Sequence, residues 1–356
     1  MQPVEEWIRE NSILEPRESS HLRYDSMEHQ APQDLAGIYR AYDPKRIYDW
    51  VDLSLTFAYL SALSTTGQVL DIGTGDGWPA LAIAPYVDSV VGIDLSEQRV
   101  KTARANLAHL GHTNVKMAVA SGENLPFADN SFDGVAVGTA IEQMNDPLRC
   151  LSEVNRVLTE KGNLVATVEH LPAELTKKLA EEVEFFRSEG GFIYRYTVKE
   201  AAPPREAEYR LFFKPKGKMH SYLSNKAASF PARPGFVRRP GEPGAMLLTG
   251  RIEADYGLPF LREAADAIDT AQYFELDHFD IPSLRHSLES AGFSDVLIRG
   301  RINRIAHPFF IDLQEKDELA DLEPHFASIC SSLGSLWRIV PPDDEPVLFA
   351  RARRMP

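Results

Sequence analysis

One stretch, residues 69–79, constrains the fold of this chain more than any other. Its apolar start, Val69 to Ile72, has the length and composition of a buried parallel strand. Three alternating glycines follow at once, and glycine permits a positive φ and a close approach of ligand to backbone. Pro79 then suits the first turn of a helix, whose free N–H groups attract anions. The stretch predicts a strand, a ligand-binding turn and a helix start.

Two classes of cofactor use this geometry, and the glycine spacing separates them. A dinucleotide-binding turn has the pattern G-x-G-x-x-G after its strand. Here the pattern is G-x-G-x-G, and Trp78 occupies the place of the third glycine. Asp71 lies inside the strand, where a carboxylate would repel a pyrophosphate but tolerate an ammonium group. The pattern therefore favours a cofactor with an ammonium group over a nicotinamide dinucleotide.

The surrounding chain alternates strand-like and helix-like runs, as in a doubly wound α/β sheet. Ser96 suits the start of one helix and Gly111 its end, and Asp146-Pro147 suits the start of another. We therefore predict a seven-stranded Rossmann-like sheet. Its strands are expected at residues 69–72, 89–93, 115–119, 132–137, 164–168, 296–299 and 347–350. Its helices are expected at 46–63, 79–84, 96–110, 148–158 and 281–291.

Two inserts interrupt this alternation. Residues 171–280 follow the fifth strand, and residues 302–345 precede the last one. Alternating aromatic residues at 192–198 and 209–213 predict a β-hairpin in the first insert. The apolar side chains of the second insert suit a dimer helix or a helix packed on its own domain. We divide the chain into an N-terminal helical segment (1–64), a core (65–170 and 281–356) and an inserted cap (171–280).

Composition narrows the class of protein and its partners. A net charge of −14 argues against broad electrostatic binding to nucleic acid, although residues 201–251 alone carry +7. No apolar run is long enough to span a bilayer, and the N-terminus lacks the pattern of a signal peptide. Cys150 and Cys330 give neither a disulfide framework nor a metal-ligand spacing. We expect a cytoplasmic protein with two reduced thiols in its core.

Further motifs follow the second and third strands. Asp94 ends the second strand, where it can accept hydrogen bonds from both hydroxyls of a ribose. The run Ser121-Gly122-Glu123-Asn124-Leu125-Pro126-Phe127 follows the third strand, and Phe132-Asp133 opens the fourth. Together with the glycine turn, this order resembles the methyltransferase type 11 group of the class I S-adenosylmethionine (SAM)-dependent methyltransferases. That group includes the ubiquinone/menaquinone C-methyltransferases, and the resemblance covers residues 65–170, 281–300 and 347–352.

The resemblance implies SAM as the cofactor. The glycine turn would hold its methionine part, Asp71 its ammonium group, Asp94 its ribose and Leu95 its adenine. Ser121 stands where the family usually has an aspartate, so Ser121 and its neighbours would contact the adenine amino group. In this family the segment ahead of the first strand commonly folds over the cofactor, which makes residues 1–64 a candidate lid. The expected cofactor-binding residues are Asp71, Gly73, Thr74, Gly75, Gly77, Asp94, Leu95, Ser121, Gly122, Glu123 and Thr139.

The predicted reaction asks little chemistry of the protein. The methyl group on a sulfonium is already activated, so the enzyme must align a nucleophile behind it and exclude water. A general base helps where the nucleophile starts protonated. His170 and Glu142 follow the fifth and fourth strands and are the candidate catalytic residues. A histidine that is hydrogen-bonded at a strand end is the alternative interpretation of His170.

We therefore predict a SAM-dependent methyltransferase that acts by in-line displacement on a small-molecule acceptor. The aromatic and basic residues of the cap suit an anionic or aromatic acceptor, although a solvated hairpin that balances an acidic core explains them equally well. Methylation of RNA or protein and a non-catalytic SAM-binding scaffold are the alternatives. No H-x-E, C-x-x-C or H-E-x-x-H spacing occurs, so we expect no metal.

Overall fold

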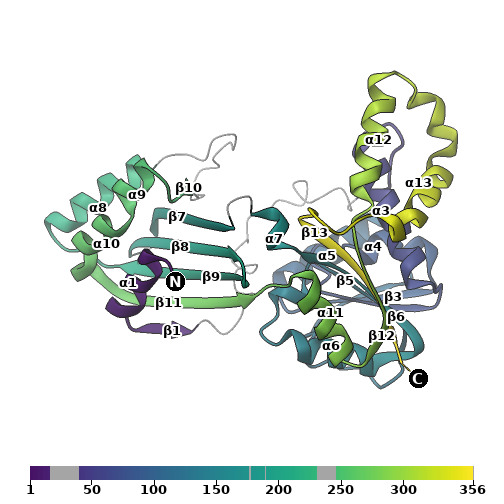
Figure 1. Ribbon diagram of the computed structural model, residues 1–356, viewed down its shortest axis with the longest axis horizontal. Coiled ribbons are helices and arrows are strands. Elements are labelled where there is room, and N and C mark those ends of the chain that lie inside the picture. Colours follow the sequence, from purple (N-terminus) through teal and green to yellow (C-terminus); the bar gives the residue numbers. More distant parts are fainter. Residues whose placement is uncertain (17–39, 176–177, 189, 231–245, 356) are drawn as a thin grey trace. The chain divides into compact units, whose positions relative to one another are not determined.

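The computed structural model describes residues 1–16, 40–175, 178–188, 190–230 and 246–355. The chain divides into two compact units, which are described separately (Figure 1). The insert unit comprises Met1–Ser19 and Leu175–His278, and the core unit comprises Ser20–Glu174 and Phe279–Pro356. The predicted N-terminal segment 1–64 is thus divided between the two units, and its residues 17–39 lie outside the described part of the chain.

The core unit contains the predicted seven-stranded sheet, in the order β12-β13-β6-β5-β2-β3-β4. Its neighbouring strands are parallel except for β13, which is antiparallel to both β12 and β6. The carboxyl ends of the parallel strands therefore meet at one edge, where ligands bind in open α/β sheets. The strands are β2 (Gln68–Ile72), β3 (Ser89–Asp94), β4 (Val115–Val119), β5 (Phe132–Gly138), β6 (Leu158–Glu169), β12 (Phe293–Gly300) and β13 (Val347–Arg354).

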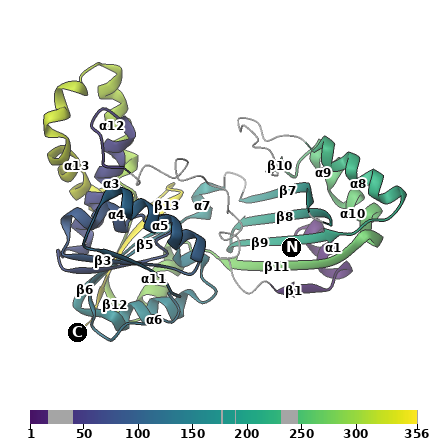
Figure 2. The same cartoon turned by 180° about the vertical axis from the view of Figure 1, so that it is seen from behind.

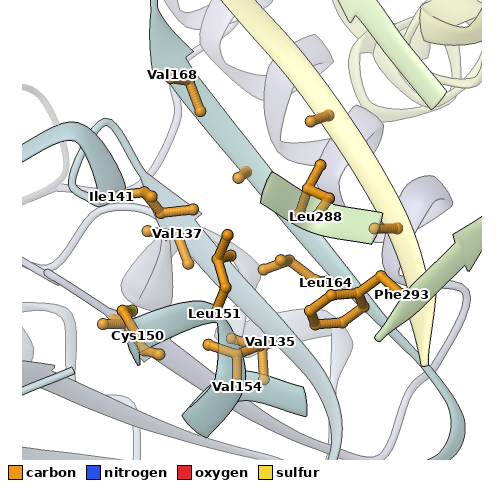
Figure 3. Close-up of a cluster of buried hydrophobic side chains, with 14 of the residues drawn as sticks. Val135, Val137, Ile141, Cys150, Leu151, Val154, Leu164, Val168, Leu288 and Phe293 are labelled. Carbon is orange, nitrogen blue, oxygen red and sulfur yellow. The ribbon is translucent and has the colours of Figure 1, made fainter. Parts of the chain in front are cut away.

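Helices cover both faces of this sheet (Figures 1 and 2). One face packs on α6 (Pro147–Val157) and α11 (Ile281–Ser290), and Figure 3 shows this hydrophobic core. The other face packs on α3 (Ile47–Leu63), α4 (Ala80–Ile83) and α5 (Glu97–Leu110). Val135 and Val137 belong to the first core, and Ala136 belongs to the second. A register slip of one residue would exchange the two cores, so burial on both faces fixes the register.

Side-chain caps place the helices where the sequence predicts them. The Oγ of Ser96 accepts a hydrogen bond from the amide of Arg99 at 3.2 Å, and α5 starts at the next residue. Gly111 takes a φ of 73° directly after the last residue of that helix. The carboxylate of Asp146 accepts the amide of Arg149 at 2.9 Å at the start of α6. Each such cap stabilises its helix by about 1 kcal/mol.

The second insert packs on α3 of its own unit. It contains α12 (Asn303–Glu315), a 3-10 helix (Ala320–His325) and α13 (Phe326–Ser335). The ring of Trp50 on α3 lies 5.0 Å from that of Phe310 and 4.7 Å from that of Phe326. Of the two interpretations of its apolar side chains, the structure therefore supports packing within the unit, and self-association through this insert stays a prediction.

The insert unit is built on a six-stranded sheet in the order β1-β11-β9-β8-β7-β10. Its helices cover one face (Figure 1). On that face, aromatic side chains of the strands form the hydrophobic core of the insert unit. The strands are β1 (Leu14–Pro16), β7 (Leu179–Ser188), β8 (Gly191–Ala201), β9 (Pro204–Phe213), β10 (Met246–Leu247) and β11 (Ile268–Asp277). The helices are α1 (Pro3–Asn11), α8 (Lys218–Ser229), α9 (Arg251–Tyr256) and α10 (Leu258–Ala264).

The predicted hairpin is confirmed as β8 and β9, which pair in antiparallel register. It belongs to a larger sheet than expected, because β7 and β11 flank it on either side. The sequence does not predict these two strands, since charged residues such as Glu182 and Glu184 interrupt their apolar residues. Among the helices that can be described in either unit, none combines the length and apolar character that a bilayer crossing requires.

Candidate functional site

The glycine turn leaves the carboxyl end of β2 in the middle of the core sheet. The amides of Gly73 and Thr74 both donate to the carbonyl of Ile93 on β3, at 2.8 and 2.9 Å. The φ angles of Gly73, Gly75 and Gly77 are +71°, +52° and +113°. These hydrogen bonds and angles hold the turn in a conformation that residues with a side chain rarely adopt.

The surroundings of the glycines show where a ligand can lie. A Cβ on Gly77 would come within 2.4 Å of Leu81, so this glycine permits the turn to pack on α4. A Cβ on Gly73 would come equally close to the side chain of Ala140. A Cβ on Gly75 would meet nothing within 4 Å. The backbone at Gly75 therefore faces open space, and a ligand can lie against it.

Asp71 lies beneath the turn and is fully buried. Its Oδ2 accepts the amide of Ala80 at 3.1 Å and so supports the start of α4. Its Oδ1 and the Oγ1 of the buried Thr74 lie near each other, and neither has a further hydrogen-bond partner among the described residues. Burial raises the pKa of Asp71 to about 8, opposed by the Thr74 hydroxyl and the Ala80 amide. An additional cation would stabilise the ionised form, and the contact with an ammonium group stays a prediction.

Asp94 connects the turn to the next helix. Its Oδ2 accepts the amide of Gly75 at 3.0 Å, and its Oδ1 accepts the amide of Ser96 at 2.9 Å. Beside it, Leu95 is 42% exposed, and Val119 at the end of β4 is 48% exposed. A carboxylate next to two uncovered apolar side chains suits a ribose with a flat base. The structure adds a function that the sequence did not predict, since Asp94 also holds the turn.

The loop after β4 contains the predicted adenine contacts. The Oγ of Ser121 accepts the amide of Glu123 at 3.1 Å, and Gly122 is buried against Met144. The Oε1 of Glu123 accepts the amide of Asn145 at 2.8 Å, in the turn before α6. The carboxylate of Glu123 is thus engaged by the backbone of this turn. The adenine contacts of these residues stay predictions.

Thr139 and Glu142 follow β5. Thr139 is exposed with a φ of +49°, and its amide donates to the carbonyl of Thr167 on β6 at 2.9 Å. Glu142 is fully buried, and its Oε1 accepts the amide of Glu169 at 3.0 Å. Among the described residues its Oε2 has no partner. Burial raises the pKa of Glu142 to about 8, which favours the protonated carboxyl at neutral pH, a form that can donate a hydrogen bond.

His170 follows β6 and is buried against the segment before β13. Its amide donates to the carbonyl of Pro346 at 2.8 Å, and its Nδ1 lies 2.9 Å from the carbonyl oxygen of Glu345. A carbonyl only accepts, so Nδ1 carries the hydrogen and Nε2 is the acceptor of the neutral ring. His170 is thus hydrogen-bonded at the end of a strand, as in the alternative interpretation. The same hydrogen bond leaves Nε2 as the nitrogen that can take a proton.

Two further polar residues at this edge belong to no sequence motif. Tyr59 on α3 is fully buried, and its hydroxyl lies 2.9 Å from the Oγ1 of Thr167. Arg301 directly follows β12, and its Nε is buried without an acceptor among the described residues. Arg301 comes from a segment far from the glycine turn in sequence, so only the fold brings it to this edge.

Most of the aromatic residues predicted to line a cap, and two of the basic ones, are engaged within the insert unit, whereas Arg233, Arg238 and Arg239 lie outside the described residues. Tyr194, Tyr209 and similar residues are buried in its own hydrophobic core. Arg210 pairs with Glu208 at 2.7 Å, and other cations of the sheet and its margin pair in the same way. The additional pairs are Arg205 with Glu5, Lys199 with Glu206 and Lys214 with Asp269. These residues therefore support the interpretation of balanced charges, and binding of an acceptor by them stays a prediction.

An open hollow of about 750 Å³ lies elsewhere in the core unit. It is lined by residues of α3 such as Phe57, by Ser331 and Ser335 of α13, and by Tyr86 of the 3-10 helix Ala84–Tyr86. Thr65 and Thr66, which precede β2, also line it. The hollow is therefore at the amino edge of the sheet, away from the glycine turn, and none of its lining residues is charged.

The described residues contain no group of three or more His, Cys, Asp or Glu side chains that could hold a metal ion. Cys150 and Cys330 are buried free thiols, and their separate positions on α6 and α13 serve packing. Burial raises the pKa of Cys150 to about 12, which keeps this thiol protonated and unreactive.

In comparisons with known proteins, the central part of the core unit matches one protein family. Residues 70–166 match the family model of a methyltransferase domain. The chain is 35% identical over 107 residues to the uncharacterised methyltransferase YcgJ of Bacillus subtilis, with 30% of this chain and 42% of YcgJ covered. It is 36% identical over 107 residues to the ubiquinone/menaquinone biosynthesis C-methyltransferase UbiE of Citrifermentans bemidjiense, with 29% and 46% covered. The chain thus spans less than half the length of these curated relatives.

Two solved structures are similar over nearly the whole chain. A SAM-dependent methyltransferase from Clostridium acetobutylicum has a TM-score of 0.48 at 10% identity, with 94% of this chain and 99% of that chain covered. The [4+2]-cyclase SpnF has a TM-score of 0.46 at 17% identity, with 97% and 99% covered. Because both TM-scores lie under 0.5, these likenesses support no conclusion about the rest of the chain.

Proposed function

We propose that this protein transfers the methyl group of SAM to a small-molecule acceptor, because residues 70–166 belong to the class I SAM-dependent methyltransferases. The matched domain confirms the predicted family and its cofactor. The observation that carries the proposal is the open backbone at Gly75, held by the half-buried carboxylate of Asp94. In this proposal the turn holds the methionine part, and Asp94, with the exposed Leu95, holds the adenosine.

The residues of the chain position the reactants and control their protons. SAM supplies, when bound, a methyl group that is already activated on a positively charged sulfur. Thr139 is exposed at the end of β5, where its backbone and hydroxyl can border the reacting atoms. Alignment of two reactants in this way contributes about 7–11 kcal/mol to the lowering of a barrier. Most of the proposed rate enhancement is therefore positional.

We assign proton removal to His170 and hydrogen-bond donation to Glu142. With its Nδ1 fixed on the carbonyl of Glu345, the neutral ring of His170 can accept a proton only at Nε2. Glu142 is protonated below a pH of about 8, so its buried carboxyl can donate to an acceptor oxygen or nitrogen. An acceptor that is already deprotonated would need neither group.

The experiment that tests the proposal is a turnover screen with SAM, in which release of S-adenosylhomocysteine is measured over small phenols, amines, thiols and carboxylates. Release that depends on an added small molecule supports the proposal. Release only with RNA or protein would replace it with methylation of a macromolecule. SAM binding without turnover of any acceptor would replace it with a SAM-binding scaffold, and preferential binding of NADH would overturn it entirely.

A further inference from the structure

The topology of the last strands places Arg301 at the ligand-binding edge of the core sheet. Arg301 follows Gly300, the last residue of β12. Because β12 and β6 are both antiparallel to β13, β12 and β6 run parallel to each other. Arg301 therefore lies along the same edge as Thr139 and His170, which follow β5 and β6.

One nitrogen of the Arg301 guanidinium, its Nε, has no hydrogen-bond partner in the described part of the chain. This Nε is shielded from solvent, and the Oδ1 of Asn303 nearby likewise has no donor among the described residues. Glu345 is close, but its carboxylate lies 3.4 Å from Arg304 and accepts the backbone amide of Arg301. The charge of Arg301 acts on Glu345 and on Asp52, but the structure shows a hydrogen bond from its guanidinium to neither.

Tyr59 connects Arg301 to the middle of this edge. Tyr59 and Asp52 lie on different turns of α3. The positive charge of Arg301 acts on both through space and opposes the rise in pKa that burial causes in each. The hydroxyl of Tyr59 lies 2.9 Å from the Oγ1 of Thr167, and the carbonyl of Thr167 accepts the amide of Thr139. Hydrogen bonds thus run from Tyr59 to the exposed end of β5, and the charge of Arg301 acts on Tyr59 through space.

The strand order gives the approximate distance between Arg301 and the glycine turn. β12 is four strand spacings from β2, about 19 Å, and three from β5, about 14 Å. Arg301 is therefore remote from the glycine turn that would hold the methionine part of SAM. A small molecule with its reacting atom over the end of β5 or β6 would extend its far end toward Arg301.

We propose that Arg301 binds a carboxylate of the methyl acceptor, an inference that rests on the proposed methyl transfer. A shielded N–H group without an acceptor costs free energy, which an incoming carboxylate would recover. The planar guanidinium matches the two oxygens of a carboxylate in a way that a lysine does not. The acceptor is thus a small carboxylic acid whose methylated atom lies at the end opposite its carboxylate.

Calorimetric titration of the full chain, saturated with S-adenosylhomocysteine, tests this inference. The probes are benzoate, 4-hydroxybenzoate and phenylacetate, each paired with its neutral amide. We expect at least one carboxylate to bind more tightly than its amide, and Arg301→Gln to weaken that binding about 10- to 100-fold. Arg301→Lys should retain part of the affinity. Arg299→Gln, which removes a nearby arginine whose Nε bonds the carbonyl of Arg338 at 2.7 Å, should change it little.

Several outcomes would overturn the inference. These are equal binding of every carboxylate and its amide, equal effects of Arg301→Gln and Arg299→Gln, or no carboxylate binding at millimolar concentration. The affinity for S-adenosylhomocysteine is measured separately in each protein and should be the same for Arg301→Gln as for the unaltered chain. If the unaltered chain does not bind S-adenosylhomocysteine, the proposed function fails, while the titrations repeated without it still test the arginine.

Discussion

The Oε1 of Glu142 accepts the amide of Glu169 at 3.0 Å, which ties the segment after β5 to the last residue of β6. The carboxyl that makes this bond is fully buried, and burial raises its pKa from 4.5 to about 8. Between these two values the folded protein holds a proton that the unfolded chain releases. The bond thus joins two strands at the candidate site and makes the stability of the core unit depend on pH.

We expect the free energy of unfolding of the core unit to fall as pH rises from about 4.5 to about 8, and Glu142→Gln to remove part of this dependence. A raised pKa favours the folded state at low pH, and each group contributes a slope of at most about 1.4 kcal/mol per pH unit. Asp71, whose pKa is also about 8, should preserve the rest of the slope in the variant. Urea denaturation across this range measures it. Identical slopes for both proteins would contradict the burial of an ionisable Glu142.

The raised pKa of Asp71 leads us to expect that SAM binding releases a proton. At pH 7 its carboxyl is largely protonated, because burial raises its pKa to about 8. An ammonium group nearby would favour the ionised form, so affinity for SAM should rise with pH until about 8. Calorimetry in two buffers of different ionisation enthalpy gives the number of protons released. Asp71→Asn should abolish the release, and equal apparent enthalpies for the unaltered chain would argue against the contact.

Asp94→Ala should weaken SAM binding about 10- to 100-fold, because it removes charge-assisted hydrogen bonds to Gly75 and Ser96 as well as the predicted ribose contact. Asp133→Ala is the matched control. Its Oδ2 accepts the amide of Gln68 at 2.8 Å, at the amino end of β2, so its loss should lower stability and spare SAM affinity. Equilibrium titration with SAM measures both variants. Unchanged affinity in Asp94→Ala would remove this residue from the site.

The sheet of the core unit is predictable because its signals are local. The strand Val69–Ile72 is apolar over its whole length, and Ser96 and Asp146 cap helices within three residues of their own positions. The glycine turn is predictable for the same reason, since conformation and spacing there depend on adjacent residues. Where one short segment determines the geometry, the sequence alone places the elements to within a few residues.

Contacts between distant segments could not be predicted in this way. In the insert unit, β1 pairs with β11 across some 250 residues, and β7 and β11 carry too many charges to be recognised as strands. At the site, no motif predicts the hydrogen bond of Glu123 to the turn before α6, nor an Nε of Arg301 that has no acceptor within the described ranges. Burial decides the protonation of Asp71 and Glu142, and burial is known only once the fold is known.

The N-terminal helix gives a prediction for the insert unit. Glu5 on α1 is fully buried, where its carboxylate bonds Arg205 at 2.9 Å and the hydroxyl of Tyr209 at 2.8 Å. Burial alone would raise the pKa of Glu5, but Arg205 and Tyr209 hold it below its usual range. Glu5→Gln should therefore cost about 3 kcal/mol, as expected when one partner of a buried pair is lost.

Glu6→Gln, on the exposed side of the same helix, is the control for that substitution and should change stability little. Because the pKa of Glu5 is lowered, its stabilisation should disappear as pH falls through that lowered value, and the two variants should then converge. Thermal unfolding of the full chain measures the difference at neutral pH. Equal melting temperatures for the two variants would show that α1 contributes no stability through Glu5.

His170→Asn should slow methyl transfer about 10²- to 10⁴-fold while leaving SAM affinity nearly unchanged, if His170 removes the proton of the acceptor. An asparagine amide can still donate to the carbonyl of Glu345, the partner of Nδ1 at 2.9 Å, but it offers no counterpart of Nε2. His170→Ala loses both functions and should also lower stability, because the carbonyl of Glu345 then lacks its donor. Rates of S-adenosylhomocysteine release, compared with melting temperatures, separate the two contributions. A fully active His170→Asn variant would leave this residue with a purely structural role at the end of β6.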